Sequence, residues 1–431
     1  MELTDEEIVE ILLDFDHDPR FEKLGEEHLH LDQTALLALQ GRWMSDKPPE
    51  SDSLLWTLSC IADDIARMPG CAGMHASEGE QNEVVIKEYS AEYALINGHD
   101  KKQFIWNTLS FSLPRSGVTF RFRRPLNLTV ITKDHSLGLF EGDLPLIRIQ
   151  KIKLEDVDEL KITVSEGLGV ITQHRRAVIG ELIIEPPMAQ YDSLLLGKLA
   201  TLLRPLTAPE IALIQTADTT LKEVAPELHQ AMITEGLRIV PLMPRSNLVR
   251  QSCSFRSVPG VVFISPEDAM EFMDLLCHEY HHLKLFRVQE FFPMTQPSDI
   301  QVATPWRTDK RSIDGLFHGI YVFAMCARLL RRMDETLELQ RKGLRREVVF
   351  RVCVEKAIAD IRAQDALLLP RGDKLCSAIA NENATQLAYL AARPMDGADL
   401  QREIDWARKK VSEHLASVER KERTQPWYLA A

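Results

Sequence analysis

The pattern of apolar residues changes twice along this chain of 431 residues, and the change limits the folds it can adopt. Between about 80 and 187, runs such as GVTFRFRRPLNLTVITKD and LPLIRIQKIKL alternate apolar and polar residues and are rich in β-branched side chains. A period of two is typical of half-buried strands. Before residue 70 and after Pro186-Pro187 the period is that of helices, so the sequence predicts an α+β protein with a boundary near 190.

Local signals refine this organisation. LTDEEIVEILLDF opens on Thr4, a residue type that caps helix N-termini, and SDSLLWTLSCIADDIARMPG repeats the helical pattern. Later, LRIVPLMP predicts a strand and SCSFRSVPGVVFIS a hairpin that turns at Pro259-Gly260. We therefore expect residues 1–190 to combine helices with a β-rich segment, as a candidate peptide-recognition region. Residues 191–431 are expected to form a mostly helical catalytic domain.

Composition argues against several classes of partner. The formal net charge of -13 would repel a polyanion, so we expect no nucleic acid partner. The N-terminus lacks a basic and then apolar signal segment, and no uninterrupted apolar run approaches the roughly 20 residues of a membrane span. The 7 cysteines are scattered and form no CxxC pair. Reduced thiols of this kind are typical of a cytoplasmic protein.

The segment LLCHEYHHLKLF contains an HExxH motif, at residues 278–282. The preceding PEDAMEFMDLLC carries acidic residues and an apolar stripe that predict a helix beginning near Pro266. On a helix, His278 and His282 lie on one face with Cβ atoms about 6 Å apart, so both imidazoles can meet one divalent metal. Glu279 would project beside the open coordination position, and His281 would point elsewhere. The alternative is a histidine-rich helix whose imidazoles bond to nearby backbone.

A catalytic site needs a further ligand, and His318 in SIDGLFHGIYVFAMCARLL is the strongest candidate. Ser312 could cap this helix, and Gly315 and Gly319 flank the histidine, as a close approach of a metal or cosubstrate would require. A core histidine on an apolar helix is the alternative reading. The carboxylates of the same region are weaker candidates; they are Glu290, Asp309 and Asp314.

The connection QPSDIQVATPWRTDKR lies between the two predicted histidine helices. It places Arg307 beside Trp306, and Arg311 follows four residues later. A guanidinium near a metal can bind a carboxylate with two parallel hydrogen bonds. We therefore expect Arg307, or alternatively Arg311, to bind the carboxylate of a cosubstrate, unless both are surface charges beside a packed tryptophan.

The ordered set FISPEDAMEFMDLLCHEYHHLKL, TPWRTDKR and GLFHGIYVFA resembles the HExxH motif family of peptide modification proteins, described as α-ketoglutarate-HExxH-type peptide β-hydroxylases. The resemblance is clearest from about 255 to 330. It implies Fe(II)- and 2-oxoglutarate-dependent hydroxylation, with O₂, at a β-carbon of a ribosomally synthesised precursor peptide. It further implies His278 and His282 as iron ligands. By position in the matching motifs, we extend the ligands to His318 and the 2-oxoglutarate contact to Arg307.

Two other functions use the same residues differently. In a zinc metallopeptidase, Glu279 would be the general base on metal-bound water and Tyr321 would help to hold the oxyanion. GLFHGIY resembles the GTxDxxYG segment of aspzincin peptidases, with His318 at the position of their Asp ligand and Leu316 replacing Thr. The third function is a non-catalytic module in which the β-rich region adds a peptide strand at a sheet edge.

Overall fold

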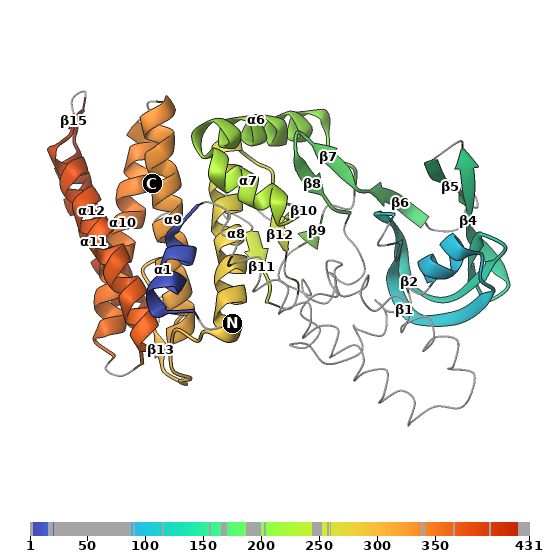
Figure 1. Ribbon diagram of the computed structural model, residues 1–431, viewed down its shortest axis with the longest axis horizontal. Helices are drawn as coiled ribbons and strands as arrows, with labels where there is room; N and C mark the ends of the chain where they lie inside the picture. Colours follow the sequence, from blue (N-terminus) through green and yellow to red (C-terminus); the bar gives the residue numbers. More distant parts are fainter. Residues whose placement is uncertain are drawn as a thin grey trace.

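The chain folds into two β-sheets and a bundle of long helices (Figure 1). The computed structural model describes residues 3–15, 20, 88, 91–113, 116–154, 157–164, 170–186, 200–201, 204–243, 252–256, 258, 260–337, 341–364, 367–395 and 398–420. Strands dominate the N-terminal half of this part of the chain and helices dominate the C-terminal half. The predicted α+β class is therefore confirmed. The segment SDSLLWTLSCIADDIARMPG lies outside the described residues.

The first sheet is an antiparallel meander in the order β1-β2-β3-β4-β5, with β6 paired to β2. Its strands are β1 (Lys101–Leu113), β2 (Val118–Lys133), β3 (Ser136–Glu141), β4 (Leu144–Leu154), β5 (Val157–Val164) and β6 (Val170–Arg175). Alternation decides which face is buried: along β2, Phe120, Leu128 and Val130 point into a core while Ile131 and Lys133 are exposed. This region has a hydrophobic core of its own.

The second sheet has the order β11-β12-β10-β8-β7, with β9 paired to β10. Its strands are β7 (Ala177–Ile179), β8 (Leu182–Ile184), β9 (Ala200–Thr201), β10 (Arg238–Met243), β11 (Ser252–Ser254) and β12 (Val261–Ile264). β10 is parallel to β8 and β12, whereas β11 returns antiparallel along β12. The predicted strand and hairpin are confirmed. Because β7 and β8 pair into this sheet, the change from one sheet to the other falls at Arg176, before the predicted boundary near 190.

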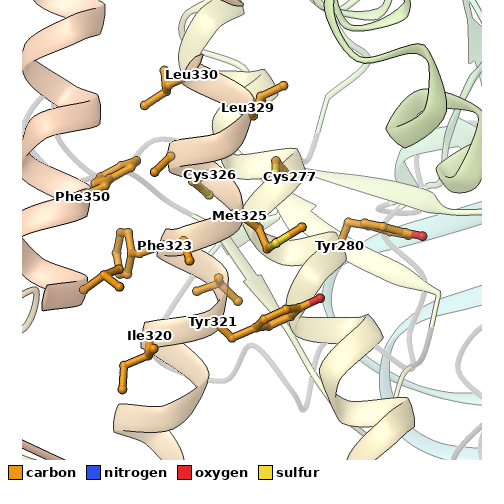
Figure 2. Close-up of a cluster of buried hydrophobic side chains, with 14 of the residues drawn as sticks. Cys277, Tyr280, Ile320, Tyr321, Phe323, Met325, Cys326, Leu329, Leu330 and Phe350 are labelled. Atoms are coloured by element: carbon orange, nitrogen blue, oxygen red, sulfur yellow. The ribbon is translucent and has the colours of Figure 1, made fainter. Parts of the chain in front are cut away.

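Seven long helices follow the first sheet. They are α6 (Ala208–Val224), α7 (Pro226–Thr234), α8 (Ala269–Phe291), α9 (Ile313–Leu337), α10 (Arg341–Arg362), α11 (Pro370–Ala392) and α12 (Leu400–Glu419). Two-residue strands form small ladders between them, β13 (Gln301–Val302) with β14 (Arg311–Ser312) and β15 (Pro394–Met395) with β16 (Ala398–Asp399). Figure 2 shows α9 at the centre, with Tyr321 and Met325 toward Cys277 and Tyr280 of α8 and Phe323 toward Phe350 of α10.

Helix α9 is the most apolar helix in the described part of the chain. The stretch Ile313–Thr336 is long and apolar enough to cross a membrane, but 83% of its most apolar window is buried inside the protein. A mostly buried helix of this kind is consistent with the core of a soluble protein. Five cysteines lie among the described residues, and all of them are free thiols.

The N-terminal helix α1 (Asp5–Leu13) packs against the helical core, not against the first sheet. Thr4 caps it as predicted, because its hydroxyl accepts from the N–H of Glu7 at 3.2 Å and the Glu7 carboxylate accepts from the N–H of Thr4 at 2.8 Å. Side chains of α8 and α9 donate to the carbonyls at its C-terminal end. These are Tyr321 to Leu12 at 2.7 Å, Arg328 to Leu13, and Lys284 to Asp14 at 2.8 Å.

Candidate functional site

Helix α8 carries the HExxH motif in its central turns. It begins at Ala269, three residues after the predicted start at Pro266, because the Asp268 carboxylate caps it by accepting from the N–H of Glu271 at 3.0 Å. The apolar positions Phe272, Met273 and Leu276 bury one side of the helix in the main core. This burial fixes the rotation of α8 and hence the direction of the histidines one turn further on.

His278 and His282 meet on one face of α8 as the spacing predicts. Their Nε2 atoms are 3.2 Å apart and their ring centroids 4.8 Å apart. Two nitrogen ligands about 2.1 Å from one divalent ion are separated by about 3.0 to 3.4 Å when the angle between them is near tetrahedral or right-angled. The Nε2 pair therefore fits two coordination positions of a single ion.

His318 joins this pair from α9, but through the wrong nitrogen for a shared ion. Ser312 accepts from the N–H of Gly315 at 3.2 Å at the start of α9, as predicted for a cap. His318 Nδ1 lies 3.1 Å from Nδ1 of His282, on the opposite side of that ring from Nε2. His282 thus stands between the other two histidines, and the described residues contain no group of three or more His, Cys, Asp or Glu side chains arranged to hold one metal ion. The fit to a metal is complete for two histidines and incomplete for the third.

Gln289 fixes the position of His318, and the sequence reasoning overlooked it. Its Oε1 lies 2.6 Å from His318 Nε2, and its Nε2 donates to the Asp314 carboxylate at 2.9 Å. Thr295 donates to the same Asp314 oxygen at 3.2 Å. Asp314, a candidate ligand, therefore anchors Gln289. The signal was available, because Gln289 lies two helical turns after His282 on the same face of α8.

Aromatic rings surround the three imidazoles. The Phe286 ring lies 4.8 Å from His318 and 6.0 Å from His282, and the Phe323 ring lies 5.1 Å from His278. Burial in this apolar setting lowers the pKa of His318 to about 3, with a smaller contribution from the charge of Arg256. Burial likewise holds the pKa of His282 well below its usual value. Both rings are neutral at pH 7, the form in which imidazole binds a metal.

Glu279 is buried and turns toward strand β11. Its carboxylate accepts from the Ser254 hydroxyl at 2.7 Å. Burial raises the pKa of Glu279 to about 7, while hydrogen bonds from Ser252 and Ser254 act in the opposite direction. The side chain therefore connects the motif helix to the edge of the second sheet, and it can exchange a proton near neutral pH.

His281 points away from the pair, as the helical spacing predicts. Its Nδ1 lies 2.7 Å from the carbonyl of Cys277, and its ring is buried against Phe15 and Tyr321. Tyr321 belongs to the same side, because its hydroxyl donates to the carbonyl of Leu12. The expected role of Tyr321 at the metal would require this hydrogen bond to break.

The connection between the two histidine helices holds its arginines in a local ion pair. Arg307 Nε lies 2.8 Å from Oδ1 of Asp309, and Arg311 Nε lies 3.2 Å from Oδ2 of the same residue. Side-chain exposures of 48% for Arg307 and 39% for Arg311 place both at the surface. Asp309, another candidate ligand, is thereby shared between two guanidinium groups.

Trp306 gives the reason for one of the two glycines. A Cβ on Gly319 would lie 1.9 Å from Cζ2 of Trp306, so the indole occupies the space that any side chain would need. The predicted reason, a close approach of metal or cosubstrate, is therefore corrected for Gly319. At Gly315 a Cβ would meet only Arg311 and Ser312 atoms at 3.4 Å, which is ordinary contact.

Arg256 is the cation nearest to the aromatic surroundings of the histidines, and no motif indicated it. It lies in the β11–β12 hairpin, with its guanidinium carbon 6.0 Å from the centre of the Phe286 ring. Its Nε is 3.5 Å from the carboxylate of Glu290, the remaining carboxylate considered as a ligand. Comparison with family models and with curated proteins finds no match to this chain.

Proposed function

We propose that this chain is an iron- and 2-oxoglutarate-dependent dioxygenase that hydroxylates a β-carbon of a ribosomally synthesised precursor peptide in the cytoplasm. The observation that carries the proposal is the His278–His282 pair, whose Nε2 atoms are 3.2 Å apart and whose rings are poised to bind a divalent ion. The motif resemblance between residues 255 and 330 supplies the choice of iron and 2-oxoglutarate.

The residues of the chain would divide the work as follows. His278 and His282 would hold the ion, and His318 would complete the set after its ring leaves Nδ1 of His282. Bound Fe(II), with 2-oxoglutarate and O₂, supplies an oxidant strong enough for a C–H bond. Phe286 and Phe323 would keep water away from the histidines, which strengthens polar interactions at the site.

The position of Glu279 agrees with a supporting role in hydroxylation. Its carboxylate accepts a hydrogen bond from Ser254, so it would hold β11 against the metal helix while the oxidant forms without its help. A buried carboxylate that links two elements in this way orients the groups around a metal.

A zinc metallopeptidase is the second candidate, and one observation favours it. Glu279 directly follows His278 and has a pKa raised to about 7, the range in which a carboxylate serves well as a general base. The commitment of the Tyr321 hydroxyl to Leu12 removes the proposed oxyanion contact and weakens this candidate. In the third candidate, a non-catalytic peptide-binding module, the histidines would hold no metal.

One experiment separates the three candidates. The full chain is loaded with Fe(II) under anaerobic conditions, its metal content is measured, and it is then exposed to O₂, 2-oxoglutarate and candidate precursor peptides. Mass spectrometry that finds one added oxygen atom, dependent on 2-oxoglutarate, supports the hydroxylase. Cleaved peptides, formed also with Zn(II) and without 2-oxoglutarate, support the peptidase. Absence of stoichiometric metal supports the module and refutes the proposal.

A further inference from the structure

Residues spaced four apart along α8 form a line that leads away from the candidate metal pair. His282, Phe286 and Glu290 share one face of the helix, and the Phe286 ring is stacked near-parallel to His282 at an interplanar angle of 21°. Arg256 from the β11–β12 hairpin covers the far end of this line, over Phe286 and beside Glu290. One aromatic ring therefore separates a guanidinium from the histidines.

Arg256 has hydrogen-bonding capacity to spare. Its contact with Glu290 runs from Nε at 3.5 Å, and its side chain makes no hydrogen bond of normal length with the residues that the structure describes. The side chain is 48% exposed, while that of Glu290 is 20% exposed. A guanidinium has five N–H donors in a planar fork, and that fork matches the two oxygens of a carboxylate.

The surroundings make this cation distinctive. The protein carries a formal net charge of -13, so an anion is generally repelled and needs a local positive charge to bind. Arg307 and Arg311 share Asp309, whereas Arg256 faces the rings that contact the histidines. The charge of Arg256 also reaches His318, where it contributes to the lowered pKa of that ring.

We propose that Arg256 binds a carboxylate group of the molecule that occupies the histidine site, with Glu290 competing for the same guanidinium. This inference rests on the proposed function for its choice of ligands. The carboxylate has two sources, the distal carboxylate of 2-oxoglutarate or an acidic side chain of the peptide. Both would be held through the same forked contact.

The test measures binding of two matched pairs of probes to the full chain, with and without Mn(II) as an ion that does not support turnover. The first pair is 2-oxoglutarate and 2-oxopentanoate, which lacks the distal carboxylate. The second pair is a short peptide with one central glutamate and its glutamine counterpart. We expect the wild type to bind the acid of one pair about 10- to 100-fold more tightly than its neutral partner. The pair that shows this preference identifies the source of the carboxylate.

Three variants make the assignment specific. Arg256→Gln should abolish the preference, whereas Glu290→Gln should increase it several-fold because the competing carboxylate is removed. Arg204→Gln is the matched control: Arg204 pairs with Glu210 on α6 at exposures of 47% and 17%, close to those of the Arg256 pair, and should leave the preference unchanged. Thermal unfolding checks each fold, and Arg256→Lys, which keeps the charge without the fork, decides if Arg256→Gln does not fold.

The outcomes also separate this inference from the proposed function. A preference that survives Arg256→Gln but disappears in Arg307→Gln overturns the assignment to Arg256, as does a wild type without preference in either pair. A protein that forms no hydroxylated product but loses its carboxylate preference in Arg256→Gln refutes the proposed reaction and retains the carboxylate site. Hydroxylation that proceeds while Arg256→Gln keeps the preference refutes the carboxylate site alone.

Discussion

Nδ1 of His318 lies 3.1 Å from Nδ1 of His282, so the two helices α8 and α9 meet through the ring nitrogens that do not face His278. His282 presents its other nitrogen, Nε2, to His278 at 3.2 Å. A metal held by His278 and His282 would therefore bind without disturbing this pair of helices, and recruitment of His318 is a separate step.

The first prediction concerns the two motif histidines. His278→Ala and His282→Ala should each abolish stoichiometric metal binding, because neither leaves two nitrogens at ligand spacing. His281→Ala should keep the metal, although removal of a buried ring should lower the free energy of unfolding by about 2 to 4 kcal/mol. Metal content after anaerobic loading checks all three. Full occupancy in His278→Ala would remove the basis of the candidate site.

The second prediction concerns the third ligand. His318→Ala should weaken metal affinity without abolishing it, because the His278–His282 pair remains. Gln289→Leu should strengthen the affinity, since it removes the hydrogen-bond partner that holds His318 Nε2 at 2.6 Å and keeps that ring from turning. Competition with a chelator of known affinity measures both changes. Identical affinities in the wild type and both variants would show that His318 is not a ligand.

The third prediction uses Glu279 to distinguish the two reactions. Glu279→Gln keeps the size of the side chain and can still accept from Ser254, so the fold should be retained. The proposed hydroxylase should keep substantial turnover in this variant. A peptidase should lose several orders of magnitude in rate, because the general base on the metal-bound water is gone. Complete loss of hydroxylation with intact metal and 2-oxoglutarate binding would assign Glu279 a direct catalytic role.

The fourth prediction concerns the close contact between Trp306 and Gly319. Gly319→Ala should lower the free energy of unfolding by about 1 to 3 kcal/mol, because the new Cβ would overlap the indole. Gly315→Ala is the control on the same helix. Its Cβ meets only ordinary contacts, so the better helix propensity of alanine should stabilise the protein by up to about 1 kcal/mol. Chemical denaturation measures both, and equal effects would contradict the steric explanation.

The fifth prediction concerns Tyr321. Tyr321→Phe should cost about 1 to 3 kcal/mol of stability, because the carbonyl of Leu12 loses its donor. Metal content and turnover per folded molecule should stay unchanged. Tyr280→Phe, which loses a hydrogen bond of 2.6 Å to Glu235, is a matched comparison on α8. A fall in rate for Tyr321→Phe without a fall in stability would instead support an oxyanion role.

Local patterns in the sequence determined the parts of the fold that depend on neighbouring residues. Alternating residues in β2, the Thr4 cap and the turn at Pro259-Gly260 each carry their own physical cause. The i, i+4 spacing of His278 and His282 belongs to the same class, because a single helix brings the two rings together whatever surrounds it.

Contacts between distant segments were decided by the tertiary structure alone. Pairing of β8 with β10 moved the change of sheet from 190 to 176, since strand pairing depends on which edge is available and leaves no local pattern. The nitrogen that His318 presents depends on Gln289, and the bulk allowed at Gly319 depends on Trp306. Arg256 gained its place over Phe286 only when the hairpin folded onto α8. Each of these is a side-chain meeting across a long loop, where sequence separation carries no information about distance.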